Sequence, residues 1–359
     1  MKRVIMCIAI SIIAIQLNAQ IDQKRINALE TFLEERMKKD QIPGLLVAAS
    51  YKGELIYTKS LGMASLEHKV PVIDSTVFEI GSISKQFTAA LIVMLEEENK
   101  LSLDDPISKY VTEIPGEWYG VTIKQLLNHT SGIPDYEAIA GYQYYDNRRT
   151  PMDIIKVANS KPLDFKPGEK FRYCNTGYYL LSMIIERVTN KSFLACLSEK
   201  ILEPLQMART GLFDPTEIIN NRASGYSRTK SRIENRRPSE PSSTLGAGGL
   251  SSTIADMAKW DAALYGNSIL STEALEKLWT PGVLNNGSKI GYGLGWRIEP
   301  YKGHKEQYHY GMMYGFVANI TRFSDDGLTF FVFANRYQLS LGRIVEAVME
   351  AFVPDLTEE

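Results

Sequence analysis

The sequence predicts an α/β (α+β) fold, in which one antiparallel sheet flanked by helices is built from both ends of the chain and an all-helical domain is inserted. Two observations carry this prediction. Strand patterns occur near both ends, within residues 44–65 and 292–335. Between them, from Ser82 to about residue 205, apolar residues recur at helical spacing. With 359 residues and 44% apolar composition, the chain can bury a large core in one domain or two.

The first residues have the order of a secretory signal peptide. Two basic residues precede an apolar run over residues 4–15, and the small residue Ala19 stands before Gln20. The run is too short to anchor the chain across a bilayer, although a retained N-terminal anchor stays the alternative. We therefore expect residues 1–19 to be removed and the protein to be exported, periplasmic or secreted, without a stable membrane anchor.

Charge and cysteine content exclude several classes of protein. Without Lys2 and Arg3, the 40 basic and 42 acidic side chains become 38 and 42, a formal charge of −4, so nucleic acid is not expected as a partner. Only Cys174 and Cys196 remain, so no disulfide framework is expected, and a single bridge between them stays open. The His residues form no metal motif and the glycine cluster 245–253 lacks the Lys of a phosphate-binding loop. Neither a metal nor a cofactor is expected.

The terminal elements follow from local patterns. Residues 22–39 predict a helix, because their apolar residues lie at helical spacing. Residues 44–65 predict two strands joined at Lys52-Gly53. Near the other end, a hairpin signal stands at residues 325–327. The sequence there predicts strands at residues 292–301, 308–316, 316–324 and 328–335, and a closing helix at residues 341–352.

The middle of the chain predicts helices at residues 83–98, 122–130, 152–160, 176–189 and 192–205, with another at residues 255–264 after a glycine turn. We therefore predict a sheet domain from residues 20–81 plus 240–359. Residues 82–239 form the inserted, mainly helical domain. Clefts prefer such boundaries, so we expect the active site in a cleft between the two.

Ser82 lies where the first strands give way to the helical insert. It begins a Ser-x-x-Lys pattern with Lys85, but Ser is also a favoured helix N-cap, so a catalytic nucleophile and a simple cap are both open. The same pattern recurs at Ser227 and Lys230, in a polar run without signs of a buried helix end. The position of Ser82 at the domain boundary favours the catalytic interpretation.

Three further segments could complete a catalytic site. Lys85, one helical turn after Ser82, could share or accept the Ser proton if it is desolvated. A second group must carry protons to the leaving atom, and Tyr173, with Asn175 two residues later, precedes a strongly apolar helix that can hold it. The Tyr-x-Asn patterns at Tyr145, in a polar loop, and at Tyr265 have weaker contexts. The third segment, on a predicted strand, offers His309, Gly311 and Met312.

The order Ser-x-x-Lys, Tyr-x-Asn and His-x-Gly, with "LLNHTSGIPDY" and "GAGGLSST" between them, resembles the serine β-lactamase and penicillin-binding-protein superfamily, in its class C-like branch. The resemblance covers nearly all the mature chain. It implies a β-lactamase/transpeptidase-like fold, Ser82 as the acylated nucleophile, Lys85 as its activator and Tyr173 as the shared acid and base. Either Lys85 or Tyr173 could take the first proton.

The resemblance also implies substrate-binding groups. Asn175 would contact the substrate, and the backbone N–H groups of Ser82 and Met312 would form the oxyanion hole beside Gly311. One departure is that His309 begins the His-Tyr-Gly stretch where many β-lactamases have Lys-Thr-Gly. His is mostly neutral at pH 7, and members with His-x-Gly include D-alanyl-D-alanine carboxypeptidases, D-amino-acid amidases and esterases.

We therefore expect an exported serine hydrolase that acts on small amides, peptides, esters or β-lactams, with cell-wall peptides among its candidate substrates. The alternative is a penicillin-binding sensor or binding module with little or no turnover. If the substrate carries a carboxylate, a basic residue of the run from Arg222 to Arg237 could bind it. His68 and His129 are interpreted as structural. The oligomeric state is left open.

Overall fold

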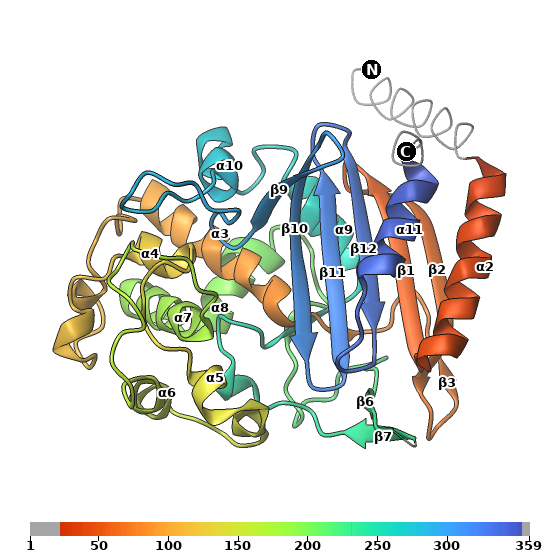
Figure 1. Cartoon of the computed structure of the whole chain (residues 1–359), viewed down its shortest axis with the longest axis horizontal. Helices are drawn as coiled ribbons and strands as arrows, with labels where there is room; N and C mark the ends of the chain where they lie inside the picture. Colours follow the sequence, from red (N-terminus) through yellow and green to blue (C-terminus); the bar gives the residue numbers. More distant parts are fainter. Residues whose placement is uncertain (1–21, 231, 354–359) are drawn as a thin grey trace.

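The computed structural model describes residues 22–230 and 232–353 (Figure 1). The predicted signal peptide, residues 1–19, lies outside the described residues. Within the described ranges no helix has the length and apolar character needed to cross a membrane.

In the described part of the chain, seven strands form one antiparallel sheet in the order β3-β2-β1-β12-β11-β10-β9 (Figure 1). The first and the last strand along the chain meet at the centre of the sheet, where β1 pairs with β12, for example Leu45 with Ala334. The sheet is therefore built from both ends of the chain, as predicted. Its strands are β1 (Gly44–Tyr51), β2 (Glu54–Ser65), β3 (Val70–Pro71), β9 (Arg297–Tyr301), β10 (His304–Met313), β11 (Phe316–Phe323) and β12 (Leu328–Ala334).

Both faces of this sheet are covered. Successive side chains of β1 point to opposite faces, so Leu45 joins one apolar cluster and Leu46 the other. The terminal helices α2 (Gln23–Asp40) and α11 (Gly342–Phe352) cover the first face (Figure 1). Both helices lie within a residue of their predicted bounds.

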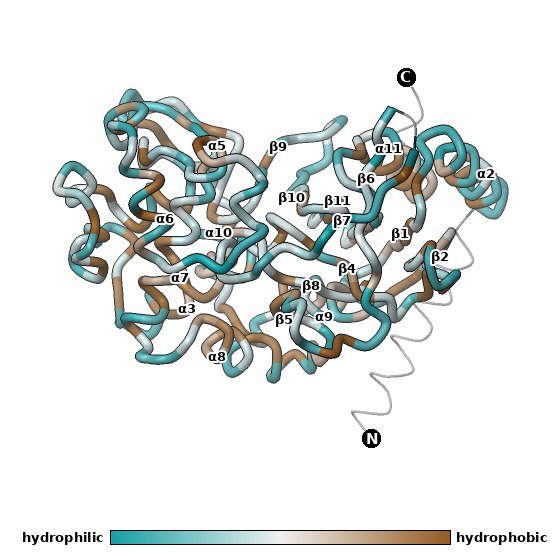
Figure 2. The backbone as a smooth tube through the Cα atoms, turned by 90° about the horizontal axis from the view of Figure 1, so that it is seen from below, coloured by the Kyte–Doolittle hydropathy of each residue, from teal (hydrophilic) through white to brown (hydrophobic). Residues whose placement is uncertain are grey.

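The second face of the sheet packs against a group of helices from the middle of the chain. Figure 2 shows α5, α6, α7 and α10 on one side of the molecule and β1, β11 and α2 on the other. The helices are α3 (Ser84–Glu97), α4 (Ile123–Leu127), α5 (Tyr136–Ala140), α6 (Pro151–Ala158), α7 (Asn175–Thr189), α8 (Phe193–Leu197), α9 (Ile254–Ala263) and α10 (Thr272–Trp279). The predicted helix at residues 192–205 is shorter than expected, because α8 passes into a π-helical turn at Ser198–Leu202.

The predicted strand at residues 292–301 is wrong in its first half, because β9 begins only at Arg297. Gly295 has a φ of +78° and approaches the carbonyl oxygen of Lys85 so closely that a β-carbon would lie 2.8 Å from it. This left-handed turn cannot continue a strand. The chain before β9 instead packs against α3.

Short strands that the sequence did not predict connect the seven-stranded sheet with the group of helices. A three-stranded sheet contains β4 (Phe78–Glu79), β8 (Leu250–Ser252) and β5 (Gly211–Leu212). The hairpin of β6 (Gly225–Arg228) and β7 (Ile233–Arg236) lies within the predicted helical insert. The predicted domain boundaries stay predictions.

The two described cysteines do not form a bridge. Cys174 and Cys196 are both buried with free thiols. Burial raises the pKa of the Cys174 thiol to about 12, so it stays protonated at neutral pH.

Candidate active site

Ser82 sits in a 3₁₀ turn, Gly81–Ile83, between β4 and the start of α3. Its hydroxyl caps neither this turn nor α3, because neither element has a side-chain cap hydrogen bond. Instead the Ser84 hydroxyl donates to the Gly81 carbonyl oxygen at 2.7 Å. The N-cap alternative for Ser82 is therefore wrong, and its hydroxyl is left to a side-chain partner.

That partner is Lys85, which is completely buried. Its Nζ lies 3.0 Å from Ser82 Oγ, 2.8 Å from Asn175 Oδ1 and 2.6 Å from the Ala247 carbonyl oxygen. The last two atoms can only accept hydrogen bonds. A neutral amine that donates to both therefore keeps its lone pair for the Ser82 hydroxyl.

Burial also changes the charge of this amine. Desolvation lowers the pKa of Lys85 to about 7, while the carboxylates of Glu137 and Asp135 act in the opposite direction. A substantial fraction of Lys85 is consequently neutral at neutral pH. The site thus has the basic group that a serine nucleophile requires.

The glycine cluster does more than turn the chain. The Ala247 carbonyl within it accepts from Lys85, and the Gly246 carbonyl accepts from Thr88 Oγ1 at 2.7 Å. The carbonyl of Leu250, also in the cluster, accepts from the Ile80 N–H at 3.0 Å. The segment therefore holds both Lys85 and the turn that carries Ser82, a role that the sequence analysis missed because the contacts span more than 150 residues.

Tyr173 lies just before α7, with its hydroxyl oxygen buried and its ring centroid 4.8 Å from Lys85 Nζ. The ring of His129 packs against it at 4.3 Å between centroids, and His129 Nδ1 accepts from the Cys174 N–H at 3.1 Å. Burial and then Tyr292 raise the pKa of Tyr173 well above its ordinary value, and Ser82 opposes the rise. Tyr173 is therefore a neutral phenol that His129 holds in place.

Asn175 begins α7 and connects Lys85 to two acidic residues. Its backbone N–H donates to Asp135 Oδ1 at 3.0 Å, and its Nδ2 donates to Glu137 Oε2 at 2.8 Å. Desolvation and Glu137 raise the pKa of Asp135 to about 6. Neither acid was identified from the sequence, although Asp135 stands inside the "LLNHTSGIPDY" segment.

His309 lies beside Tyr173, with 6.0 Å between ring centroids, but is buried. Its Nδ1 is 2.7 Å from the Tyr310 carbonyl oxygen, which requires the proton on Nδ1, so Nε2 accepts from the Tyr292 hydroxyl at 2.9 Å. Desolvation and Lys85 lower the pKa of His309 to about 3. Both ring nitrogens therefore have partners, and a direct contact with substrate would require one of these bonds to break.

Gly311 and Met312 lie in the half of β10 that β9 does not reach, since the pairing of those strands ends at Tyr308 with Arg297. The Ser82 turn packs there instead. A β-carbon on Gly311 would lie 1.9 Å from the Ile80 carbonyl oxygen and 3.3 Å from the Ser82 nitrogen. The absence of a side chain is what lets the two backbones approach.

We expect Gly311→Ala to lower kcat/KM by about 10²-fold or more, because the turn carrying Ser82 must shift and small misplacements are costly in catalysis. The measurement is ester hydrolysis together with the melting temperature. Gly342→Ala is the matched control, since a β-carbon there meets no atom within 4 Å. Unchanged kcat/KM in Gly311→Ala would mean that this contact is not needed to align Ser82.

Arg297 is a cation near the site that the sequence analysis missed. Its charge acts on Tyr173, Tyr292 and His309, and its side chain is half-buried. Its guanidinium has no hydrogen bond or ion pair within residues 22–230 and 232–353. A cation in this position can meet an anionic group.

The basic run from Arg222 to Arg237, which was expected to supply this cation, lies only partly near the candidate site. Arg236, on β7, places its guanidinium 5.8 Å from the ring centroid of Tyr314, two residues after Met312. Arg222 donates to the Asp214 carbonyl oxygen at 3.3 Å and faces the ring of Phe213. Arg232 pairs with Glu234 on the same hairpin.

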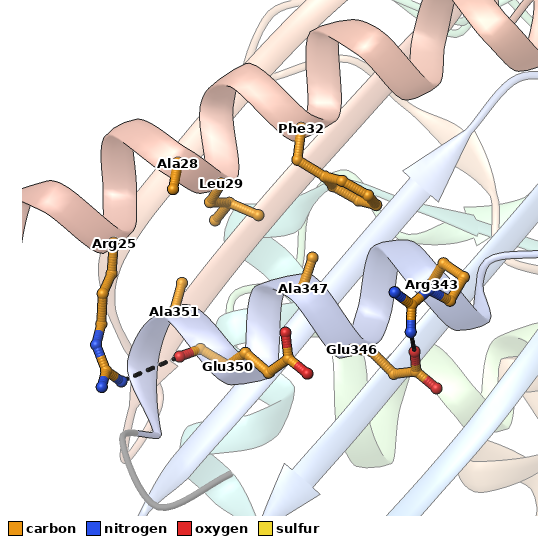
Figure 3. Close-up of a pocket in the computed structure, with 9 residues that line it drawn as sticks. All are labelled: Arg25, Ala28, Leu29, Phe32, Arg343, Glu346, Ala347, Glu350 and Ala351. Carbon is orange, nitrogen blue, oxygen red and sulfur yellow. Dashed lines mark hydrogen bonds and ion pairs between the residues drawn. The ribbon is translucent and has the colours of Figure 1, made fainter. Parts of the chain in front are cut away.

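A surface cavity of about 290 Å³ lies elsewhere, between α2 and α11 (Figure 3). It is lined by apolar side chains such as Phe32 and by an ion pair between Arg343 and Glu346. None of the predicted site residues lines it. It therefore contributes nothing to the arrangement around Ser82.

Comparison with known proteins gives matches that cover most of this chain. The family model described as Beta-lactamase matches residues 29–348. A penicillin-binding protein of Bacillus subtilis (strain 168) is 32% identical over 332 residues, which cover 88% of this chain and 72% of that protein. The octameric penicillin-binding protein homologue from Pyrococcus abyssi has a TM-score of 0.81 at 31% identity, covering 92% of this chain and 77% of that one.

The fold recurs in a more distant enzyme. D-amino acid amidase from Ochrobactrum anthropi SV3 superposes with a TM-score of 0.80 over 90% of this chain and 98% of its own, at 24% identity. This match concerns the fold alone.

Proposed function

Because the chain belongs to the beta-lactamase family, we propose that it is an exported serine hydrolase that acts through an acyl-enzyme on Ser82. The observation that carries the proposal is the setting of Lys85: a buried amine with a pKa lowered to about 7, 3.0 Å from Ser82 Oγ. Such a base can activate a hydroxyl at neutral pH.

In the acylation step, Ser82 Oγ bonds to the substrate carbonyl carbon while its proton passes to neutral Lys85 Nζ. The N–H groups of Ser82 and Met312 stabilise the oxyanion. The bond to the leaving group then breaks, and that group takes a proton from the Tyr173 hydroxyl, which regains one from Lys85. The lowered pKa of Lys85 and the raised pKa of Tyr173 favour Lys85 as the first base.

Hydrolysis of the acyl-enzyme uses the same groups. Water adds to the acyl carbon and gives its proton to the Tyr173 and Lys85 pair, which returns it to Ser82 Oγ as the ester bond breaks. No charge on His309 is required, which suits its pKa of about 3.

The substrates proposed are small amides, peptides, esters or β-lactams, with peptides of the cell wall as candidates. The names of two relatives, a penicillin-binding protein of Bacillus subtilis and a penicillin-binding protein homologue from Pyrococcus abyssi, support β-lactams as candidate ligands. Neutral His309 removes the cation of a Lys-Thr-Gly segment, so efficient β-lactam hydrolysis is the less favoured activity.

Arg297 is proposed to bind a carboxylate of the substrate. We expect Arg297→Gln to lower kcat/KM for a carboxylate-bearing substrate by about tenfold more than for its amidated twin, or ~1.4 kcal/mol. Arg236→Gln, in the basic run, is the comparison. If the ratio changes only in Arg236→Gln, the basic run and not Arg297 selects anionic substrates; if it changes in neither, the substrate is neutral.

Intact-protein mass spectrometry tests the function directly. The protein is incubated with a β-lactam and, separately, with a short-chain nitrophenyl ester. Rapid turnover of the ester supports the hydrolase. A lasting adduct on Ser82 with little turnover supports the second candidate, a penicillin-binding sensor, and neither adduct nor turnover would contradict both. The unmodified mass also tests export, which predicts a mature chain that starts at Gln20.

A further inference from the structure

Glu137, on α5, contacts the candidate active site through Asn175. Its carboxylate oxygen Oε2 accepts from Asn175 Nδ2 at 2.8 Å and also accepts from the buried hydroxyl of Tyr145. Since a carboxylate can only accept, the Asn175 amide must turn its nitrogen toward Glu137. Its oxygen then faces Lys85 Nζ at 2.8 Å. Glu137 thus decides which end of Asn175 meets the lysine.

The charge of Glu137 also acts on Lys85. Several titratable groups from different elements face this amine: Glu137, Asp135, Cys174, His129 and His309, with the rings of Tyr173 and Tyr178 within 5.3 Å of Nζ. His129 and His309 both have pKa values lowered by burial and are neutral. The Cys174 thiol is protonated. The two carboxylates are therefore the charged groups that oppose the loss of the lysine proton, and Glu137 has the larger effect.

We propose that Glu137 is a positioning residue for the Ser82 and Lys85 pair: it orients Asn175, and its negative charge sets the pH below which Lys85 stays protonated and the enzyme loses activity. The inference rests on the proposed function. Only the neutral amine accepts the Ser82 proton, so kcat/KM falls on the acid side as Lys85 gains a proton. With the pKa of Lys85 at about 7, this acid limb is expected near pH 7 in the wild-type protein.

Glu137→Gln removes the charge while keeping a carbonyl oxygen that can accept from Asn175. Without the carboxylate, the ammonium form of Lys85 loses stabilisation, so its pKa falls and the acid limb moves to lower pH. A shift of about one pH unit is expected for loss of a neighbouring charge. The readout is kcat/KM for a nitrophenyl ester, measured from about pH 5 to about pH 9, a range that brackets the expected titration of Lys85.

Three further variants separate charge from structure. Asp135→Asn should move the limb in the same direction by less, because Asp135 is the second charge acting on Lys85. Tyr145→Phe removes a hydrogen bond to Glu137 but keeps its charge, so the limb should stay in place even if the rate changes. Asp146→Asn, an exposed carboxylate outside the groups that act on Lys85, should change neither.

A second readout does not depend on turnover. The ¹³Cε chemical shift of Lys85, assigned by comparison with Lys85→Arg, reports its titration in the folded protein. The inference predicts a lower midpoint in Glu137→Gln by both readouts. An unchanged or higher midpoint in the shift titration would overturn it, whether or not the protein hydrolyses the ester. If Glu137→Gln lowers the Lys85 midpoint as expected but the wild-type protein does not hydrolyse the ester, the result contradicts the proposed function and not the inference on Glu137.

Discussion

Replacing Ser82 with alanine should abolish covalent labelling by a β-lactam and lower ester hydrolysis by about 10⁴-fold or more, because the proposed acyl-enzyme forms on the Ser82 hydroxyl. The loss should come without unfolding. Ser82 makes no cap hydrogen bond to either neighbouring helical element, so the cost of a lost cap, about 1 to 2 kcal/mol, does not apply. Labelling is followed by intact mass and folding by the melting temperature.

Ser227→Ala is the matched control for this variant. Ser227 also begins a Ser-x-x-Lys pattern, but it lies on β6, buried, while Lys230 is exposed, and the two have no hydrogen bond within the described chain. The Ser227→Ala variant should be labelled and should hydrolyse the ester like the wild type. Retained labelling of Ser82→Ala would remove Ser82 from the mechanism and direct attention to another nucleophile.

Tyr173→Phe should lower kcat by about 10²- to 10⁴-fold with little change in KM, because a general acid and base acts mainly in the transition state. Phenylalanine keeps the ring that packs on His129 at 4.3 Å between centroids, so Lys85 and Asn175 should keep their geometry. Steady-state kinetics at neutral pH measure both constants. A change in KM alone would make Tyr173 a binding residue.

The other Tyr-x-Asn tyrosines differ as controls. Tyr265→Phe should behave like the wild type, because the hydroxyl of Tyr265 lies 3.5 Å from Thr329 Oγ1 on β12 and has no hydrogen bond to a residue of the candidate site within the described chain. The expectation that Tyr145 lies in a polar loop was wrong. Tyr145 is buried and donates to Glu137, so its replacement belongs with the tests of that residue.

Local sequence patterns determined most of the elements and the order of the motifs. The continuous apolar run of β1 and the helical spacing in α2 and α11 each lie within one segment. The run predicts a strand that is buried on both faces, and the helical spacing predicts a helix that is buried on one. Ser82 and Lys85 are also a local pair, because residues three apart share a face of a helix. Such features need no knowledge of distant contacts.

The tertiary structure decided what this pair can do. The partners of Lys85 come from α7 and from the glycine cluster, 90 and 162 residues away, and its burial, which lowers its pKa, comes from the packing of all of them. The orientation of Asn175 depends in turn on Glu137, from a short helix without a recognisable motif. The neutral state of His309 also comes from the tertiary structure, since burial lowers its pKa and protein groups bind both of its ring nitrogens. Desolvation and hydrogen-bond direction are properties of the assembled environment, so no local pattern could have predicted them.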